Sequence, residues 1–422
     1  NLDMSVISPP TAGTAPAVGG EMTDMSKLRP PEPGKGAAVI VVGGGVTGLS
    51  AAWWLAQAGI DVLVLEKGIV GWEASGRNGG GATHPVSPLF REEQRLWPMM
   101  DELLGYPTEF RPHRIRVALH EDEMEERLRG AAIAVDQGFT FEKLDNKTLR
   151  ELVPIVDETA VGGILSNYGG HANPQRTVQA YAWALQDRGG RIQQHTTVQE
   201  FELRNGRVIG VLTDQGRFGC DALVLAAGPQ TAWLAARMGI DVPIASARVE
   251  MIVTEPLPLM KHGGVDGGGL YGRQTLRGNL AYGGGPHEWL QAQGLRTARP
   301  VNSPVLRSLA RRLRELFPKA AHVRVIRSWA GIVENTPDGR PILDRLKNPE
   351  NVVVATMSSV GFGLSPASGR AIAQLVTQGH SDFADLRQLD LARFADLAPD
   401  WRARFGWIEV APQLDESPAV VS

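Results

Sequence analysis

Apolar runs of strand length recur along the chain and are separated by segments of helical periodicity. Residues 37–42 form an unbroken apolar run, and residues 61–67 predict a second buried strand with the apolar run 62–65 at its centre. Between them, residues 47–59 place apolar side chains at helical spacing and stop at Gly59, a residue type that commonly ends helices. Unbroken apolar strands with a helix between them are typical of a parallel sheet covered on both faces. The pattern predicts an α/β fold.

Later segments add strands, a hairpin and helices to this unit. Residues 191–216 alternate apolar and polar positions around Asn205-Gly206, which predicts a β-hairpin. Residues 221–228 predict another buried strand, and residues 351–379 predict a strand, a glycine turn and a helix that begins near Leu364. The charged runs at residues 121–127 and 307–316 are expected to be solvated faces of helices.

Composition, charge and cysteine content narrow the classes of function. A chain of 422 residues exceeds the usual size of one core, so two domains are expected. The net charge of −3, from 43 basic and 46 acidic residues, gives no field that would gather nucleic acid. The single cysteine, Cys220, excludes an internal disulfide and a multi-cysteine metal site. The single cysteine fits a reducing compartment, so we expect a cytoplasmic protein, and we expect no bound metal. No apolar run approaches the roughly 20 residues of a membrane span.

The first strand ends in a glycine-rich turn with the spacing of a nucleotide-binding fingerprint. Gly43, Gly45 and Gly48 give G-x-G-x-x-G, and Glu66 ends the second strand 18 residues after the last glycine. The first glycine permits a tight turn, the second lets the backbone approach a pyrophosphate, and the third lets helix and strand pack closely. An acid at this distance accepts hydrogen bonds from an adenosine ribose. The fingerprint fits NAD and FAD equally.

A second glycine-rich loop favours FAD. The loop GWEASGRNGGGATH contains Arg77, Asn78, Gly79 and Gly80, and it resembles the second flavin-contacting segment of the D-amino acid oxidase superfamily. That group includes glycine oxidase, sarcosine oxidases, gamma-glutamylputrescine oxidase and the flavin subunits of opine and proline dehydrogenases. Further resemblance is carried by NYGGHANPQRTVQAYAWALQDRGGRI, LYGRQTLRGNLAYGGG, RSWAGIVENTPDGRPIL and NVVVATMSSVGFGLSPASG. Together these segments extend the resemblance from residue 37 to about residue 379.

The resemblance implies a Rossmann-like FAD-binding domain with an interleaved α+β substrate domain. The FAD-binding domain is expected to combine residues 37–90, 150–230 and 325–385, and the substrate domain residues 91–149 and 231–324. Residues 1–36 are expected to form a flexible arm, because they are rich in Pro, Gly and Thr. Residues 386–422 are expected to form a tail that is helical at first and then mobile.

The resemblance also implies which residues bind the cofactor and the substrate. Expected cofactor contacts are Gly43, Gly45, Val46, Thr47, Gly48, Glu66, Lys67, Arg77, Asn78, Gly79, Gly80, Val198, Gly228, Gly331, Asp338, Gly361, Phe362, Gly363 and Leu364. Tyr271, Arg273 and Arg327 are expected at the catalytic site, where one of the arginines would bind a substrate carboxylate.

The chain departs from its oxygen-using relatives at two positions. Gly331 stands where some members carry a cysteine that tethers the flavin, so a cysteinyl bond is excluded. Leu364 stands where the same relatives carry a lysine associated with oxygen activation, so we expect slow turnover with oxygen. His84 and His171 are candidates for a covalent link or a substrate contact, although a hydrogen-bonded loop histidine is the more common outcome. Arg248 and Glu250 either line the cleft or form surface ion pairs.

The reaction implied by the resemblance is oxidation of an amino acid or secondary amine. A hydride passes from the carbon beside the nitrogen to flavin N5, and the imine product hydrolyses. The expected partners are this small molecule and an electron acceptor, which is oxygen, a dye or quinone, or a partner subunit in a homo- or hetero-oligomer. One alternative is a non-catalytic or electron-transferring flavoprotein subunit of a multi-component complex. Another is an NAD-dependent dehydrogenase.

Overall fold

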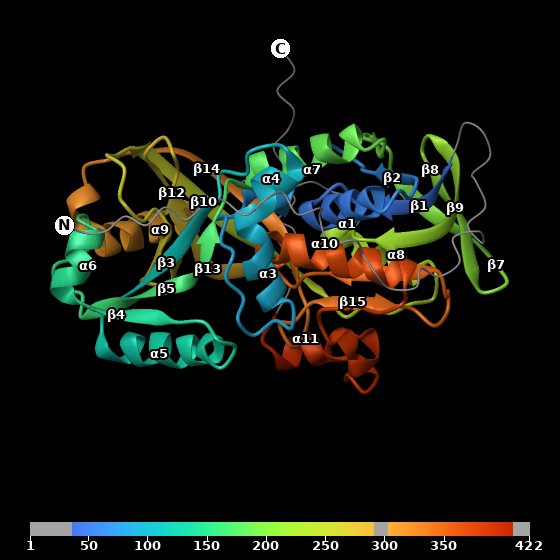
Figure 1. The fold of residues 1–422 in the computed structure, drawn as a ribbon. Helices are drawn as coiled ribbons and strands as arrows, with labels where there is room; N and C mark the ends of the chain where they lie inside the picture. The colour runs from blue at the N-terminus through green and yellow to red at the C-terminus, as the bar shows by residue number, and fades with distance from the viewer. Residues whose placement is uncertain (1–35, 291–302, 408–422) are drawn as a thin grey trace, which may run out of the picture.

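A computed structural model describes residues 36–290 and 303–407. The expected arm at residues 1–36 and the mobile end of the expected tail therefore lie almost entirely outside the described residues. Three sheets build the described part of the chain, and they lie in two lobes side by side (Figure 1). No helix of the described residues is long and apolar enough to cross a membrane.

The largest sheet has the parallel core that the apolar runs predict. Its strands run in the order β15-β16-β9-β1-β2-β6, and the hairpin of β7 and β8 joins it through β9. All neighbours along the path are parallel except β15, which is antiparallel to β16. The strands are β1 Gly36–Val42, β2 Val62–Leu65, β6 Arg191–Gln193, β7 Val198–Arg204, β8 Arg207–Thr213, β9 Gly216–Leu225, β15 Ile342–Arg345 and β16 Val352–Thr356.

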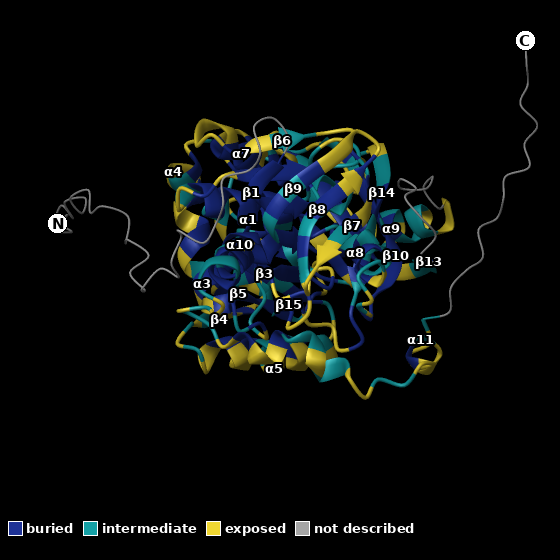
Figure 2. Ribbon diagram, turned by 90° about the vertical axis from the view of Figure 1, so that its right-hand side faces the viewer, coloured by how far each residue is buried: buried dark blue, intermediate teal, exposed yellow. Residues whose placement is uncertain are grey.

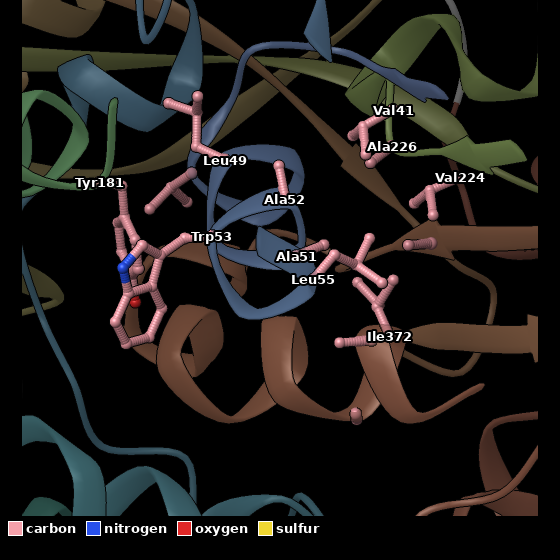
Figure 3. Packing of buried hydrophobic residues seen from close by; sticks show 14 of the residues in the cluster. Val41, Leu49, Ala51, Ala52, Trp53, Leu55, Tyr181, Val224, Ala226 and Ile372 are labelled. Atoms are coloured by element: carbon pink, nitrogen blue, oxygen red, sulfur yellow. The ribbon is translucent and has the colours of Figure 1, made fainter. Parts of the chain in front are cut away.

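Helices pack tightly on this sheet and form the main core. Helix α1 lies against both α7 and α10, and its alanines and Leu49, Trp53 and Leu55 are buried (Figure 3). Figure 2 shows α1 and β1 in the buried colour, whereas α5 at the edge of the molecule is largely exposed. The helices are α1 Val46–Gln57, α2 Ala74–Arg77, α3 Phe90–Leu96, α4 Met100–Leu104, α5 Glu121–Val135, α6 Asn146–Leu152, α7 Pro174–Asp187, α8 Thr231–Ala236, α9 Ser303–Leu316, α10 Gly361–Thr377 and α11 Trp401–Arg404.

Two four-stranded sheets form the second lobe. One has the order β12-β13-β10-β14 and the other the order β11-β3-β5-β4. A separate apolar core lies between them and α9. The strands are β3 Arg111–Ala118, β4 Phe141–Asp145, β5 Gly162–His171, β10 Ala245–Pro256, β11 Val265–Asp266, β12 Leu270–Gln274, β13 Asn279–Leu290 and β14 Val325–Asn335.

The sheets divide the chain differently from the expected domain boundaries at three places. Strand β5 lies within expected FAD-domain residues 150–230 but pairs with β3 and β4, and β14 at the start of residues 325–385 pairs with β10. Conversely, α3 and α4, expected in the substrate domain, pack with α10 and the main core. The sheet that a strand joins depends on partner strands far away in the sequence, and local sequence patterns do not identify those partners.

Helix α10 begins at Gly361, one turn before the expected start near Leu364. The run at residues 307–316 belongs to α9, whose charged side chains form the expected solvated face, while Leu309, Leu313 and Leu316 on the other face are buried against the second core. The predicted hairpin is present, with Arg204 opposite Arg207 across the Asn205-Gly206 turn. Beyond residue 385 the described tail has two short 3-10 turns and α11.

Candidate functional site

A cavity opens where the central parallel strands end. In open α/β sheets, ligands bind at the carboxyl ends of the strands. The cavity has about 1280 Å³ of empty space, its mouth included. Residues from segments far apart in the chain line it: Val42, Gly43, Gly45, Val46, Thr47, Leu65, Glu66, Lys67, Glu73, Ala74, Ser75, Asn78, Thr196, Thr197, Val198, Ala226, Ala227, Gly228, Pro229, Gln230, Leu234, Ile332, Val333, Glu334, Ala355, Met357, Ser359, Gly361 and Phe362.

The glycine turn after β1 has the conformation that its sequence requires. Gly43 has φ +113°, and a Cβ there would lie 2.3 Å from the Ala226 carbonyl oxygen. A Cβ on Gly48 would lie 2.1 Å from the Gly43 oxygen, so this glycine sets the distance between helix and turn. Gly45 caps α1 without a side-chain hydrogen bond. The positive end of the α1 dipole therefore faces the cavity directly.

Glu66 lies at the rim of this turn and holds it in place. Its Oε2 accepts a hydrogen bond from the Gly44 backbone N–H at 2.7 Å, and its Oε1 accepts one from Gly68 N–H at 2.8 Å. Each carboxylate oxygen has further lone pairs, which can accept hydrogen bonds from ligand hydroxyls. Lys67 follows on the same wall of the cavity.

The second glycine-rich loop folds as the short helix α2 and an extended exit. Asn78 donates to the carbonyl oxygens of Ala74 and Ser75, and its Oδ1 accepts from Gly80 N–H at 2.8 Å. Ser75 Oγ accepts from Val46 N–H at 2.9 Å, which ties α2 to the first turn of α1. This loop lines one side of the cavity through Ala74, Ser75 and Asn78.

Eight predicted cofactor residues do not line the cavity. Arg77 turns away and donates to the Ala330 carbonyl oxygen at 2.7 Å, and Asp338 pairs with Arg393 at 2.8 Å. Leu364 is fully buried within α10, which begins one turn earlier than expected. The others are glycines, which position neighbouring elements by close packing: Gly48, Gly79, Gly80, Gly331 and Gly363.

Several lining residues were not predicted. Glu73, Ala74 and Ser75 precede the predicted loop residues, and Ile332, Val333 and Glu334 come from β14. The motif RSWAGIVENTPDGRPIL contains the β14 residues, so it carried the signal that this strand reaches the site. Which of its side chains face the cavity depends on the alternation of β14 in a sheet whose register only the structure gives.

The predicted substrate residues lie near a second, larger cavity between α7 and the β12-β13-β10-β14 sheet. It has about 2580 Å³ of empty space, its mouth included, and Arg273 and Arg327 line it, whereas Tyr271 does not. Arg273 is buried and donates to the Gly79 carbonyl oxygen at 2.9 Å. Burial lowers the pKa of Arg273 to about 10, which leaves it charged at neutral pH. Tyr271 packs against Gly79.

The two candidate histidines have different environments. His84 Nδ1 forms a hydrogen bond with Oε1 of the fully buried Glu93, at 2.7 Å. His171 is buried without a hydrogen-bond partner for either ring nitrogen among the described residues. Burial, with smaller contributions from Arg114, Arg273 and Arg111, holds the pKa of His171 well below its usual range. Neither histidine lines the first cavity.

The remaining candidates lie away from both cavities. Arg248 and Glu250 are buried on β10 and their side chains are 3.3 Å apart, so they form a buried pair rather than a surface pair. Cys220 is buried in β9, and burial raises the pKa of its thiol to about 12, which makes it a core residue. Within the described ranges, no group of three or more His, Cys, Asp or Glu side chains is arranged to hold a metal ion.

The sheet order, the glycine turn and the acid after the second strand define a nucleotide-cofactor protein of the Rossmann type. The model of the DAO family, described as FAD dependent oxidoreductase, matches residues 38–375, and the chain belongs to this family. It is therefore an FAD-dependent oxidoreductase.

Known proteins similar to the chain carry related names. The beta chain of sarcosine oxidase from Rhizobium meliloti (strain 1021) is 31% identical over 370 residues, which cover 83% of this chain and 87% of the relative. Glycine oxidase of Geobacillus kaustophilus (strain HTA426) is 27% identical over 379 residues, covering 84% of this chain and 96% of the relative. The crystal structure of L-proline dehydrogenase from P. horikoshii has a TM-score of 0.79 at 23% identity and covers 86% of this chain and 98% of its own, which shows a shared fold.

The first cavity fits FAD. The glycines at positions 43 and 45 place no side chain of their own at the α1 amino end, where Ser75 Oγ bonds the Val46 N–H, and this turn suits a pyrophosphate. Glu66 offers acceptors for ribose hydroxyls, and its charge disfavours a phosphate on that ribose. The amino end of α10, at Gly361 and Phe362, also lines the cavity, where its dipole would favour negative charge on a reduced flavin.

Proposed function

We propose that the chain oxidises an amino acid or a secondary amine. The observation that carries the proposal is that one cavity brings together Gly43, Glu66, Asn78 and Gly361, each predicted by resemblance to amine-oxidising flavoproteins. Relatives named for sarcosine oxidase and glycine oxidase support the substrate class. Bound FAD would accept the hydride, which carries both electrons, from the carbon beside the nitrogen, and the nitrogen loses a proton.

The protein's own contribution is orientation and charge. We propose that Glu66 and the α1 turn hold the adenosine and phosphate part of the cofactor, and the α10 amino end and residues of β14 complete the lining. The ionisable side chains that line it are Glu66, Lys67, Glu73 and Glu334. No histidine is among the residues that line the cavity in the described part of the chain, and we propose that the amine loses its proton before it reacts, without a dedicated base.

An anaerobic substrate screen tests this proposal. Purified holoenzyme is mixed with sarcosine, glycine, proline, opines and other secondary amines, and the bleaching of the flavin absorbance is followed. Rapid bleaching by at least one amine is the expected result. Inertness toward every amine and amino acid would instead favour an electron-transferring subunit, and a colourless protein that reduces NAD would favour the dehydrogenase alternative.

We further propose that a partner protein covers the second cavity. Relatives named as subunits of sarcosine oxidase and opine oxidase support a multi-component enzyme. The second cavity has five arginines and one glutamate in its lining, and Trp72 and Trp183 at its rim are 53% and 40% exposed. Exposed tryptophans and arginines are enriched at protein interfaces. Co-purification of this chain with the products of neighbouring genes tests the proposal, and Trp183→Ser should weaken the complex.

A further inference from the structure

Glu334 is an acidic side chain in the cofactor cavity to which the sequence assigned no role. It lies near the end of β14 and lines the cavity with Ile332 and Val333. Its side chain is only 8% exposed. A buried carboxyl at a ligand site carries a large desolvation cost if it is ionised.

The two oxygens of Glu334 have different surroundings. Oε1 accepts from Met357 N–H at 3.0 Å and faces the Thr356 hydroxyl at 3.3 Å. Oε2 points toward Gly228, where it lies 3.7 Å from the position that a Cβ would occupy, and Gly228 also lines the cavity. Since Oε1 is occupied as an acceptor, a proton on this carboxyl belongs on Oε2, on the side of the cofactor.

Little positive charge is available to keep Glu334 ionised. Strand β16, the turn at residues 357–361 and the turn at residues 228–230 contain no charged residue. Strand β10 pairs with β14 and places Ser246 opposite Glu334; its Arg248, opposite Ile332, forms ion pairs with Glu250 and Glu288. The other ionisable residues that line the cavity are Glu66, Glu73 and Lys67, and FAD adds its pyrophosphate charge. Arg77 bonds to Ala330 instead, and burial raises the pKa of Glu334.

We propose that Glu334 is a neutral carboxylic acid that donates a hydrogen bond from Oε2 to bound FAD. The inference builds on FAD binding, which family membership establishes, and it does not depend on the substrate. An ionised Glu334 could neither donate this bond nor avoid repulsion by the pyrophosphate. FAD binding therefore takes up a proton wherever the free protein has Glu334 ionised, and affinity falls as the pH rises above the pKa of Glu334.

The test measures FAD affinity of the apoprotein between pH 6 and pH 9 by quenching of flavin fluorescence. For the unaltered protein, Kd is expected to be constant at low pH and then to rise by up to about tenfold per pH unit, the slope of one proton. Glu334→Gln keeps an acceptor for Met357 and a neutral donor toward the cavity. It should match the unaltered protein where the Kd of the latter is constant, and it should show no such rise at higher pH.

A second variant separates this role from simple packing. Thr356→Val removes the hydroxyl that stabilises the ionised carboxylate, so the rise in Kd should move to higher pH while its slope stays the same. Circular dichroism of each apoprotein checks that the fold is retained. The proposal is overturned if Glu334→Gln keeps the pH dependence of the unaltered protein, or if FAD binds more tightly as the pH rises.

Discussion

Glu66 shows how one side chain connects the local fold to the ligand. Its carboxylate accepts backbone hydrogen bonds from Gly44 and Gly68, so it shapes the turn on which a pyrophosphate would sit. The same side chain lines the cavity at the place where the sequence predicts the ribose. Loss of this side chain therefore acts on affinity both through ligand contacts and through the turn.

We predict that Glu66→Ala weakens FAD binding by about 1.5 to 3 kcal/mol, the range for hydrogen bonds to a charged group. This corresponds to a rise in Kd of roughly 10-fold to 150-fold, measured by fluorescence titration of the apoprotein. Glu66→Gln is the matched control, because it keeps one acceptor oxygen, and it should lose less. Equal FAD affinity in all three proteins would show that Glu66 does not contact the cofactor.

We also predict that FAD is held without a covalent bond. Cys220 is buried in the core, His171 does not reach the cofactor cavity, and His84 is paired with Glu93. Precipitation with acid should therefore leave yellow flavin in the supernatant. If the colour stays with the pellet, mass spectrometry of tryptic peptides would show which histidine carries the flavin.

At the scale of elements, α1 and α10 approach each other closely (Figure 3). Gly369 of α10 faces Ser50 of α1, and a Cβ there would lie 2.0 Å from Ser50 Oγ and 2.6 Å from its Cβ. Ser50 also donates to the Ser365 carbonyl oxygen at 2.7 Å, so the two helices are joined by a hydrogen bond as well as by contact. The orientation of α10, and with it Gly361 in the cavity, depends on this contact.

We predict that Gly369→Ala destabilises the protein by about 1 to 3 kcal/mol, the usual cost of overpacking a core. The substitution should also loosen FAD, because the α10 amino end would shift. Gly130→Ala in α5 is the matched control: no atom lies within 4 Å of the new Cβ, so helix propensity should raise stability by about 0.5 to 1 kcal/mol. Chemical denaturation of both variants measures the difference, and a stabilised Gly369→Ala would contradict the close contact of the two helices.

The elements of the nucleotide-binding half were predictable because their signals are local. The glycine turn, the acid after β2 and the hairpin at Asn205-Gly206 each depend on residues close together in sequence. The placement of β5 and β14 could not be predicted from the sequence, because each pairs with strands that are well separated from it in the chain. Glu334 was not predicted for the same reason, because its position in the cavity lining depends on the register of β14 with β10.

At the scale of the whole molecule, Arg114 joins the two sheets of the second lobe. It forms a bidentate pair with Asp266 on β11 and donates to the carbonyl oxygens of Gly170 on β5 and Gly272 on β12. Its side chain is 4% exposed, so water does not compensate for the loss of any partner. Such a buried pair is costly to break on one side, because the remaining charge stays buried.

We predict that Asp266→Ala lowers the stability of the protein by about 3 to 5 kcal/mol. The exposed pair of Arg150 and Glu158 provides the control, and Glu158→Ala should leave the melting temperature nearly unchanged. Replacing both Arg114 and Asp266 by leucine should recover part of the loss, since no unpaired charge then remains. A double variant that is less stable than Asp266→Ala would show that the arginine's carbonyl contacts matter more than its pairing.

The electron acceptor is also decided by the assembled molecule. Lys67, next to Glu66 in the chain, is the one lysine among the described residues that line the cofactor cavity. A positive charge near the flavin stabilises the superoxide formed when the first electron leaves, and Leu364 is buried and apolar. We predict slow reoxidation of the reduced protein in air-saturated buffer and faster reoxidation by a dye. Stopped-flow absorbance measures both rates, and equal rates would identify the protein as an oxidase.

The cofactor cavity is assembled from segments that range from Gly43 near the start of the described chain to Phe362 near its end. A ribosome makes these segments in order, so the nascent chain cannot complete its FAD site until β14, β16 and the start of α10 have emerged. Loading of the cofactor therefore comes after synthesis of nearly the whole chain. In a cell short of riboflavin, the finished apoprotein would persist without the cofactor that contacts segments of both lobes. It would be most susceptible to proteolysis during that interval.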